Sequence, residues 1–156
     1  MIKNWLIEHL YRKKITAIIF NEKNEFLVVQ LVSYREKDWN FPGGGIEVDE
    51  TEEKALFREL QEELGTNNFE IIKKSKNLSI YNWPLKVIIQ KWIEMHEIYI
   101  GQSARHFIVK FTGIKTDIKL DPIEIRKVKW IKRSEFKNYF HFPNQVKITE
   151  DVIKEY

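Results

Sequence analysis

Short apolar runs rich in β-branched residues recur along the chain, separated by glycine, proline, asparagine and charged residues. Residues 15–20 (ITAIIF) and 25–32 (EFLVVQLV) are two such runs, and the four residues between them are Asn-Glu-Lys-Asn. Two apolar runs joined by a short polar connection predict a β-hairpin. The same criteria predict three more strands, over residues 85–93, 106–112 and 128–131.

Helical periodicity is clearest between Thr51 and Leu64. Four apolar side chains recur there on one helical face, namely Ala55, Leu56, Leu60 and Leu64. Thr51 is suited to cap the first turn, where Glu52 and Glu53 complement the helix dipole. Gly65 is suited to end the helix, because glycine adopts the left-handed conformation of a C-terminal cap.

The segment before this helix has the composition of a loop. Residues 39–45 are Trp-Asn-Phe-Pro-Gly-Gly-Gly, and proline lacks a backbone donor while glycine adopts angles closed to other residues. Two more helices are predicted near the end of the chain, over residues 134–140 and 144–156. No repeat, low-complexity tract or linker interrupts the 156 residues, so we expect one domain over residues 1–156.

Composition narrows the class of protein. Hydrophobic residues make up 43% of the chain and charged residues 31%, which is typical of a globular protein with a buried core. Cysteine is absent, which excludes disulfides, thiolate metal ligands and a thiol nucleophile. The first ten residues lack the apolar core of a signal peptide, and no stretch approaches 18 apolar residues. We therefore expect a cytoplasmic protein with no membrane association.

The charge is distributed unevenly. The net charge is +3, yet residues 44–66 carry eight acidic and only two basic side chains. An acidic segment inside a basic protein suits a cation site surrounded by groups that attract a polyanion. The alternative is a solvated acidic helix on a lysine-rich surface.

Three carboxylates share one face of the helix predicted over residues 51–64. Glu59 and Glu63 are one helical turn apart, and Glu62 lies beside them. Like charges so close repel one another, so a bound cation or a proton is needed to stabilise them. Mg²⁺ suits such a site because it prefers hard oxygen ligands and leaves positions for water and phosphate. An exposed acidic face is the alternative for these three residues alone.

The flanking residues favour the cation site. Eight positions match the pattern G-x5-E-x7-R-E-U-x-E-E-x-G, where U is a bulky aliphatic residue: Gly44, Glu50, Arg58, Glu59, Leu60, Glu62, Glu63 and Gly65. Such a match arises by chance on the order of once in 10⁸ starting positions. This pattern is the Nudix box, here at residues 44–66, so the chain resembles the Nudix hydrolases. Thr66 and Asp49 depart from the residues that the family prefers at those positions.

This resemblance implies an α/β fold, namely an α/β/α sandwich with a mixed β-sheet and a loop–helix–loop catalytic motif. It implies that Glu59, Glu62 and Glu63 are Mg²⁺ ligands, with Mn²⁺ as a substitute, and that Gly44 lends its backbone to the metal site. Arg58 and Glu50 are expected to form a supporting ion pair. Attack by water on phosphorus needs a general base, for which Glu62, Glu63 or a carboxylate of a later loop all remain open.

Outside the box, the chain is similar to the branch that contains bacterial RNA 5′-pyrophosphohydrolases and diadenosine tetraphosphate hydrolases. The similarity runs from about Tyr11 to the carboxyl end. Four segments carry it: Tyr11–Arg12, Trp39–Pro42, Ile100–Phe107 and the Glu124–Trp130 pair.

The branch suggests roles for six further residues. By this resemblance, Glu124 is a fourth metal-site carboxylate and a candidate general base, while Arg12 grips a terminal phosphate. Tyr81 and Phe142 fall near positions that stack a base, although core packing explains most aromatic residues. Gln102 and Arg105 are candidates to line the phosphate path, and a turn residue and a solvated base explain them equally well.

Three residues depart from the branch. Gly43 replaces a glutamine that usually precedes the paired glycines. Val32 and Ser33 stand where basic residues commonly face the triphosphate, and Arg35 or Lys37 are the nearest substitutes.

Three functional hypotheses follow. The first is an enzyme that removes pyrophosphate from 5′-triphosphorylated RNA or cleaves dinucleoside polyphosphates, and the second is an enzyme for mononucleotides such as a modified nucleoside triphosphate or ADP-ribose. The third is a noncatalytic sensor or RNA-binding module, which the intact set of carboxylates argues against. We expect a nucleotide or 5′-phosphorylated RNA as substrate and no DNA, and the sequence leaves the oligomeric state open.

Overall fold

Six strands form one mixed sheet in the computed structural model, which describes residues 2–156 and the side chains from Trp5 onward. The strands are β1 (Tyr11–Phe20), β2 (Glu25–Leu31), β3 (Phe69–Lys74), β4 (Ser79–Asn82), β5 (Gly101–Phe111) and β6 (Ile125–Lys132). Their order is β3-β5-β1-β2-β6, and β4 pairs with β5 as well. Only β1 and β5 run parallel to each other, and the remaining pairs are antiparallel.

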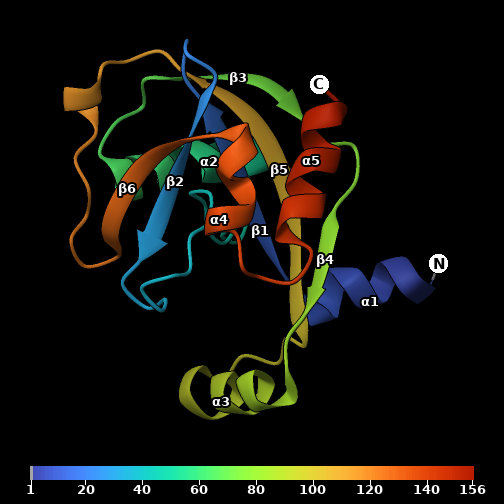
Figure 1. Ribbon diagram of the computed structural model, residues 1–156. Helices are drawn as coiled ribbons and strands as arrows, with labels where there is room; N and C mark the ends of the chain where they lie inside the picture. Colours follow the sequence, from blue (N-terminus) through green and yellow to red (C-terminus); the bar gives the residue numbers. More distant parts are fainter. Residues whose placement is uncertain (1) are drawn as a thin grey trace.

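Helices cover both faces of this sheet (Figure 1). Among residues 2–156 the α-helices are α1 (Ile2–Leu10), α2 (Glu52–Leu64), α3 (Leu85–Met95), α4 (Phe136–Tyr139) and α5 (Gln145–Lys154), of which α2 lies on one face and α4 and α5 lie on the other. The α2 side chains Leu56 and Leu60 pack with Ile15 on one face, while Phe136 of α4 and Val152 of α5 belong to the core of the other face. The expected α/β/α sandwich with a mixed sheet is therefore confirmed.

Alternation along β1 divides the core between the two layers. Ile15, Ala17 and Ile19 belong to the cluster that contains the α2 side chains, whereas Ile18 belongs to the cluster under α4 and α5. Side chains of a strand point alternately to opposite faces of the sheet. The parity of a residue in β1 therefore decides which layer it contacts.

The predicted hairpin is confirmed, since Ile19 pairs with Leu27 and Phe20 with Phe26. Beyond these pairs, the loop of residues 39–45 inserts between the two strands. Ala17 donates its backbone N–H to Pro42 O at 2.8 Å, and Ile15 donates to Gly44 O at 2.9 Å. The loop thus satisfies the backbone of β1 where β2 has separated from it.

Helix α2 follows the sequence prediction closely. The Thr51 side chain accepts a hydrogen bond from the Lys54 backbone N–H at 3.2 Å. Gly65 adopts the left-handed conformation at φ 67° and donates its N–H to Gln61 O. The two C-terminal helical predictions also hold, as a 3-10 turn (Arg133–Glu135) that leads into α4 and as α5, which begins after Asn144.

The strand predicted over residues 85–93 is wrong, because these residues form helix α3. Leu85, Ile89 and Trp92 are spaced at helical intervals, and the short β-branched run Val87–Ile89 between them favoured a strand, because such a run does not by itself distinguish the two. The helix stands apart from the sheet (Figure 1), and Leu85, Ile89 and Trp92 are exposed. Lys91 contacts the residues that flank the helix, with its ammonium 4.8 Å from the Trp83 ring centroid and 3.7 Å from a Glu97 oxygen.

The other two strand predictions are confirmed, although both observed strands begin earlier than predicted. Residues 106–112 fall mainly in β5, which begins at Gly101, and residues 128–131 fall in β6, which begins at Ile125. Strands β3 and β4 and helix α1 were not predicted. Among residues 2–156, no helix is both long enough and apolar enough to cross a membrane.

His106 on β5 makes stability depend on pH. Its side chain is buried, its Nε2 lies 2.9 Å from Ser79 Oγ, and its Nδ1 has no hydrogen-bond partner. Burial lowers the pKa of His106 to about 4, and the nearby positive charge of Lys14 adds to this effect. The neutral ring stabilises the fold fully above the unfolded pKa near 6.5, and this contribution is lost as the pH falls from there toward 4.

We expect His106→Gln to flatten this dependence. Between pH 7 and pH 4 the free energy of unfolding of the wild type should fall by up to about 3 kcal/mol more than that of the variant. Urea denaturation at a series of pH values measures both curves, and subtraction removes the contribution of the carboxylates. Parallel curves would contradict the assignment.

Candidate active site

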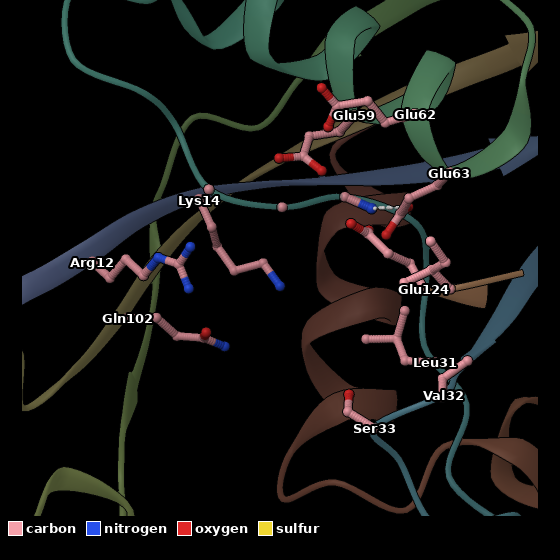
Figure 2. Close-up of a pocket in the computed structure, with 14 residues that line it drawn as sticks. Arg12, Lys14, Leu31, Val32, Ser33, Glu59, Glu62, Glu63, Gln102 and Glu124 are labelled. Atoms are coloured by element: carbon pink, nitrogen blue, oxygen red, sulfur yellow. Dashed lines mark hydrogen bonds between the residues drawn. The ribbon is translucent and has the colours of Figure 1, made fainter. Parts of the chain in front are cut away.

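A pocket of about 540 Å³ opens between the glycine-rich loop, the α2 carboxylates and the ends of β1 and β2. Four glutamates line it: Glu59, Glu62, Glu63 and Glu124. Two basic residues, Arg12 and Lys14, line it from β1. Figure 2 shows the acidic residues gathered near α2 and the basic residues on the other side of the cavity. The pocket therefore has an acidic part and a basic part.

Two of the α2 carboxylates are withdrawn from water. The exposed fraction is 3% for Glu63 and 9% for Glu59, whereas Glu62 is exposed. Burial raises the pKa of Glu63 to about 8, although its Oε2 accepts a hydrogen bond from the Gly43 backbone N–H at 3.0 Å. Burial also raises the pKa of Glu59. Glu63 therefore needs a nearby positive charge in order to be ionised at neutral pH.

Glycine is required at two positions of the loop. Gly43 has φ +143°, and a Cβ there would lie 2.3 Å from the backbone oxygen of Ile15. A Cβ on Gly44 would lie 2.3 Å from the Glu59 carboxylate. The loop backbone therefore approaches the carboxylate more closely than any side chain permits.

We expect Gly44→Ala to lower kcat by about 10²-fold, because displacement of a reacting group by roughly 1 Å has that effect. Gly45→Ala is the matched control, since its Cβ would meet only the flexible guanidinium of Arg12, at 3.0 Å. Steady-state kinetics with thermal melting checks both variants. A Gly44→Ala enzyme with wild-type kcat would show that the approach to Glu59 is not needed.

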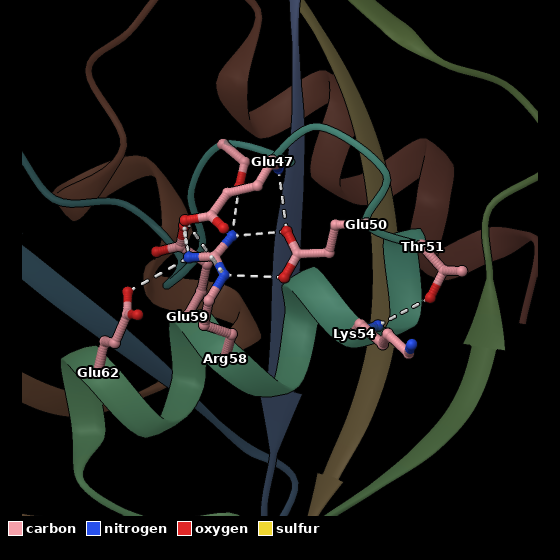
Figure 3. Close-up of polar contacts among 8 residues, drawn as sticks. Glu47, Glu50, Thr51, Lys54, Arg58, Glu59 and Glu62 are labelled. Carbon is pink, nitrogen blue, oxygen red and sulfur yellow. Dashed lines mark hydrogen bonds and ion pairs between the residues drawn. The ribbon is translucent and has the colours of Figure 1, made fainter.

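Arg58 organises the acidic helix (Figure 3). Its Nε and Nη2 donate to the two oxygens of Glu50, each at 2.8 Å, and Nη2 also donates to Gly45 O at 2.8 Å. Its Nη1 donates to Glu59 at 2.9 Å and to Glu62 at 3.3 Å. The hydrogen bonds from Arg58 lower the pKa of Glu50 to about 2. The predicted ion pair of Arg58 with Glu50 is confirmed, and it ties the loop to α2.

The residues of the pocket fit a divalent cation in chemistry and charge. Carboxylate oxygens are hard ligands, and two of these carboxylates are buried beside a loop that only glycine can form. Within residues 2–156, no three acidic or histidine side chains converge closely enough to hold an ion between them. Glu59 and Glu62 both accept hydrogen bonds from Arg58.

Glu124 reaches the pocket from a part of the chain far from the box. It precedes β6, and its backbone oxygen accepts a hydrogen bond from the Val32 N–H at 2.8 Å. Figure 2 shows it near Glu63, and its charge contributes to the raised pKa of both Glu59 and Glu63. The structure thus brings Glu124 together with the three box glutamates.

Two of the predicted substrate-binding residues line the pocket. Arg12 and Gln102 are register partners on the parallel strands β1 and β5, so their side chains lie on the same face. Tyr81 of β4 pairs with Gln102 of β5, but it is not among the residues that line the pocket. Phe142 packs edge-on against Tyr34, with 5.1 Å between ring centroids, and also lies outside the lining set.

Arg105 is placed elsewhere. It pairs with Ile15, so its side chain points to the α2 face, where Nε lies 3.2 Å from Glu52 and Nη1 donates to Ser75 O and Lys76 O. These contacts stabilise the fold, and Arg105 does not line the pocket.

Lys14 lines the pocket but was not predicted as a site residue. The signal available in the sequence was its spacing of two residues from Arg12, which puts both side chains on one face of a strand.

The comparisons with known proteins agree with this geometry. A sequence model of the family described as NUDIX domain matches residues 10–152. The RNA pyrophosphohydrolase of Orientia tsutsugamushi (strain Boryong) is similar, with 31% identity over 148 residues that cover 94% of this chain and 89% of that protein. The family match and this relative support a hydrolase that acts on pyrophosphate bonds. This chain belongs to the Nudix family.

Solved structures show the same fold. The E. coli dihydroneopterin triphosphate pyrophosphohydrolase is similar with a TM-score of 0.72 and 16% identity, covering 93% of this chain and 99% of that one. A C. elegans Ap4A hydrolase is similar with a TM-score of 0.60 and 18% identity, covering 92% and 99%. At these identities the likeness extends to the architecture alone.

Proposed function

We propose that this protein is a Mg²⁺-dependent hydrolase that removes pyrophosphate from 5′-triphosphorylated RNA or cleaves dinucleoside polyphosphates. The observation that carries the proposal is the pocket in which four glutamates face two basic residues of β1. A chain of phosphates fits this division, with one end at a cation held by the carboxylates and the other at the basic side chains. The similar protein of Orientia tsutsugamushi is named for action on RNA.

In this mechanism Glu59, Glu62 and Glu63 would hold the cation, and the Gly44 backbone lies against the carboxylate of Glu59. When bound, Mg²⁺ neutralises charge on the phosphate oxygens and acidifies the attacking water. Arg58 aligns Glu59 and Glu62 through Nη1 and fixes the loop through Gly45 O. Arg12 offers a planar guanidinium to a phosphate group.

Glu124 is the general base in this proposal. Among the described residues, its carboxylate has no hydrogen-bond or ion-pair partner, whereas Glu62 is bonded to Arg58 and Glu63 to the Gly43 N–H. A carboxylate without a partner in the pocket is able to accept the proton of water as the bond to phosphorus forms.

A mononucleotide pyrophosphatase is the second candidate. Val32 and Ser33 line the pocket where the RNA-acting branch commonly carries basic residues, so this part of the wall has no positive charge. A shorter substrate, such as a modified nucleoside triphosphate or ADP-ribose, needs fewer basic contacts along that wall.

The test is hydrolysis of a substrate panel with and without Mg²⁺, with products resolved. The panel contains 5′-triphosphorylated RNA, diadenosine tetraphosphate, the nucleoside triphosphates and ADP-ribose. Phosphate or pyrophosphate released from RNA, or ATP from the dinucleotide, supports the first proposal, and activity on mononucleotides alone supports the second. No hydrolysis of any member with Mg²⁺ or Mn²⁺ would favour a noncatalytic sensor.

A further inference from the structure

The basic part of the pocket comes from alternate residues of one strand. Arg12 and Lys14 line the pocket from β1, whereas Lys13 between them does not. Side chains two residues apart on a strand share a face and lie roughly 6–7 Å apart along it. The neighbour of Lys14 on β5 is Ala104, whose small side chain leaves room beside the lysine.

The wall formed by the end of β2 is uncharged. Leu31, Val32 and Ser33 line the pocket there. The two nearby basic residues do not compensate, because Arg35 and Lys37 are not among the lining residues and Arg35 is bonded to Asp38 at 2.8 Å. Among the residues that line this pocket in the described chain, Arg12 and Lys14 carry all of the positive charge.

Lys14 lies in the pocket without a partner. Its side chain extends from β1 into the cavity in Figure 2, between Arg12 and Glu124. No hydrogen bond or ion pair joins its ammonium to any residue from Trp5 to Tyr156. Burial lowers the pKa of Lys14, and the charges of Glu63 and Glu59 oppose that effect. An ammonium so placed gains stability from an anion that enters the pocket.

We propose that Lys14 binds a phosphate of the substrate from β1, and so replaces the basic residues that the branch commonly carries at the end of β2. The spacing of Lys14 and Arg12 lets successive phosphates of one chain reach both side chains. The substrates that gain affinity from both contacts are therefore triphosphates or longer polyphosphates. This inference rests on the proposed function for its catalytic readout only.

The alternative is that Lys14 only balances the charge of Glu63. A counter-charge of this kind would change the pH profile and the Mg²⁺ dependence, with little effect on phosphate affinity. Phosphate binding and turnover must therefore be measured separately.

The experiment compares Lys14→Met with the matched control Lys13→Met, which removes the same charge from the opposite face of β1. On the substrate that the wild type hydrolyses best, Lys14→Met should raise KM about 10- to 100-fold, with a smaller change in kcat, as expected for a lost charged contact. Lys14→Arg should retain most of the affinity, and Lys13→Met should stay within twofold of the wild type.

The second readout is binding of inorganic tripolyphosphate to the metal-free protein by isothermal titration calorimetry. Lys14→Met should weaken this binding about 10-fold or more, and Lys13→Met should not. Thermal melting checks the fold, with Lys14→Gln as the second variant if Lys14→Met is unstable.

Tripolyphosphate affinity and KM both within twofold of the wild type in Lys14→Met would overturn the inference, as would a change confined to pH or Mg²⁺ dependence. A wild type that hydrolyses nothing in the panel would instead refute the proposed function. The tripolyphosphate measurement decides the role of Lys14 in either case.

Discussion

Glu63→Gln should lower kcat by on the order of 10³-fold or more, because loss of a metal ligand exceeds the 10- to 100-fold loss caused by its outer partners. Glutamine keeps an oxygen that accepts the Gly43 N–H, so the loop stays in place while the negative charge is removed. Steady-state kinetics at saturating Mg²⁺ measures the effect. Turnover near the wild-type value would mean that Glu63 is not a ligand.

The same variant has a defined effect on stability. In the metal-free protein the pKa of Glu63 is raised to about 8 by burial, from a usual value of 4.5. A raised carboxyl pKa favours the fold at low pH, and this contribution is lost as the pH rises through 8. Metal-free Glu63→Gln should therefore match the wild type near pH 5 and exceed its unfolding free energy by a few kcal/mol at pH 9. Urea denaturation at the two pH values checks this expectation.

Arg58→Lys should lower kcat/KM by about 10- to 100-fold, as mutation of groups that orient metal ligands generally does. One ammonium cannot reproduce the two parallel bonds to Glu50 together with those to Gly45 O and Glu59. The Mg²⁺ concentration needed for half-maximal activity should rise as well. Kinetics over a Mg²⁺ series measures both quantities.

Glu47→Gln is the matched control for Arg58→Lys. Glu47 lies 3.9 Å from Arg58 Nε, and its side chain is 71% exposed, so its contribution is small. We expect activity within twofold of the wild type. If Arg58→Lys were equally active, the guanidinium would be dispensable for positioning the carboxylates.

Prediction from sequence succeeded where the signals are local. Thr51 caps α2, Gly65 ends it and its leucines face the core, because each feature depends on residues within one or two turns. The Nudix box is likewise a continuous motif, so its fixed spacing indicated the family and the Arg58–Glu50 pair. Over residues 85–93 local information was ambiguous, since a short β-branched run suits a strand or an amphipathic helix.

Placement of the remaining site residues depended on strand register. The parallel pairing of β1 with β5 puts Arg12, Gln102 and Lys14 on one face. Arg105 lies three residues after Gln102 on β5, so its side chain points to the opposite face of the sheet, where it contacts Glu52. A sequence pattern names these residues but does not fix which partner strand lies beside them.

The sequence by itself thus determined the family, the capped helix and the identity of the box carboxylates, because short-range spacing encodes them. The resemblance pointed to Glu124, and the fold brings it into the pocket that Glu63 lines. The tertiary structure alone decided that Lys14, rather than Arg35, faces the pocket. These contacts join segments tens of residues apart. Only the packed sheet and the inserted loop bring them together, since pairing of distant strands is set by burial of the whole core.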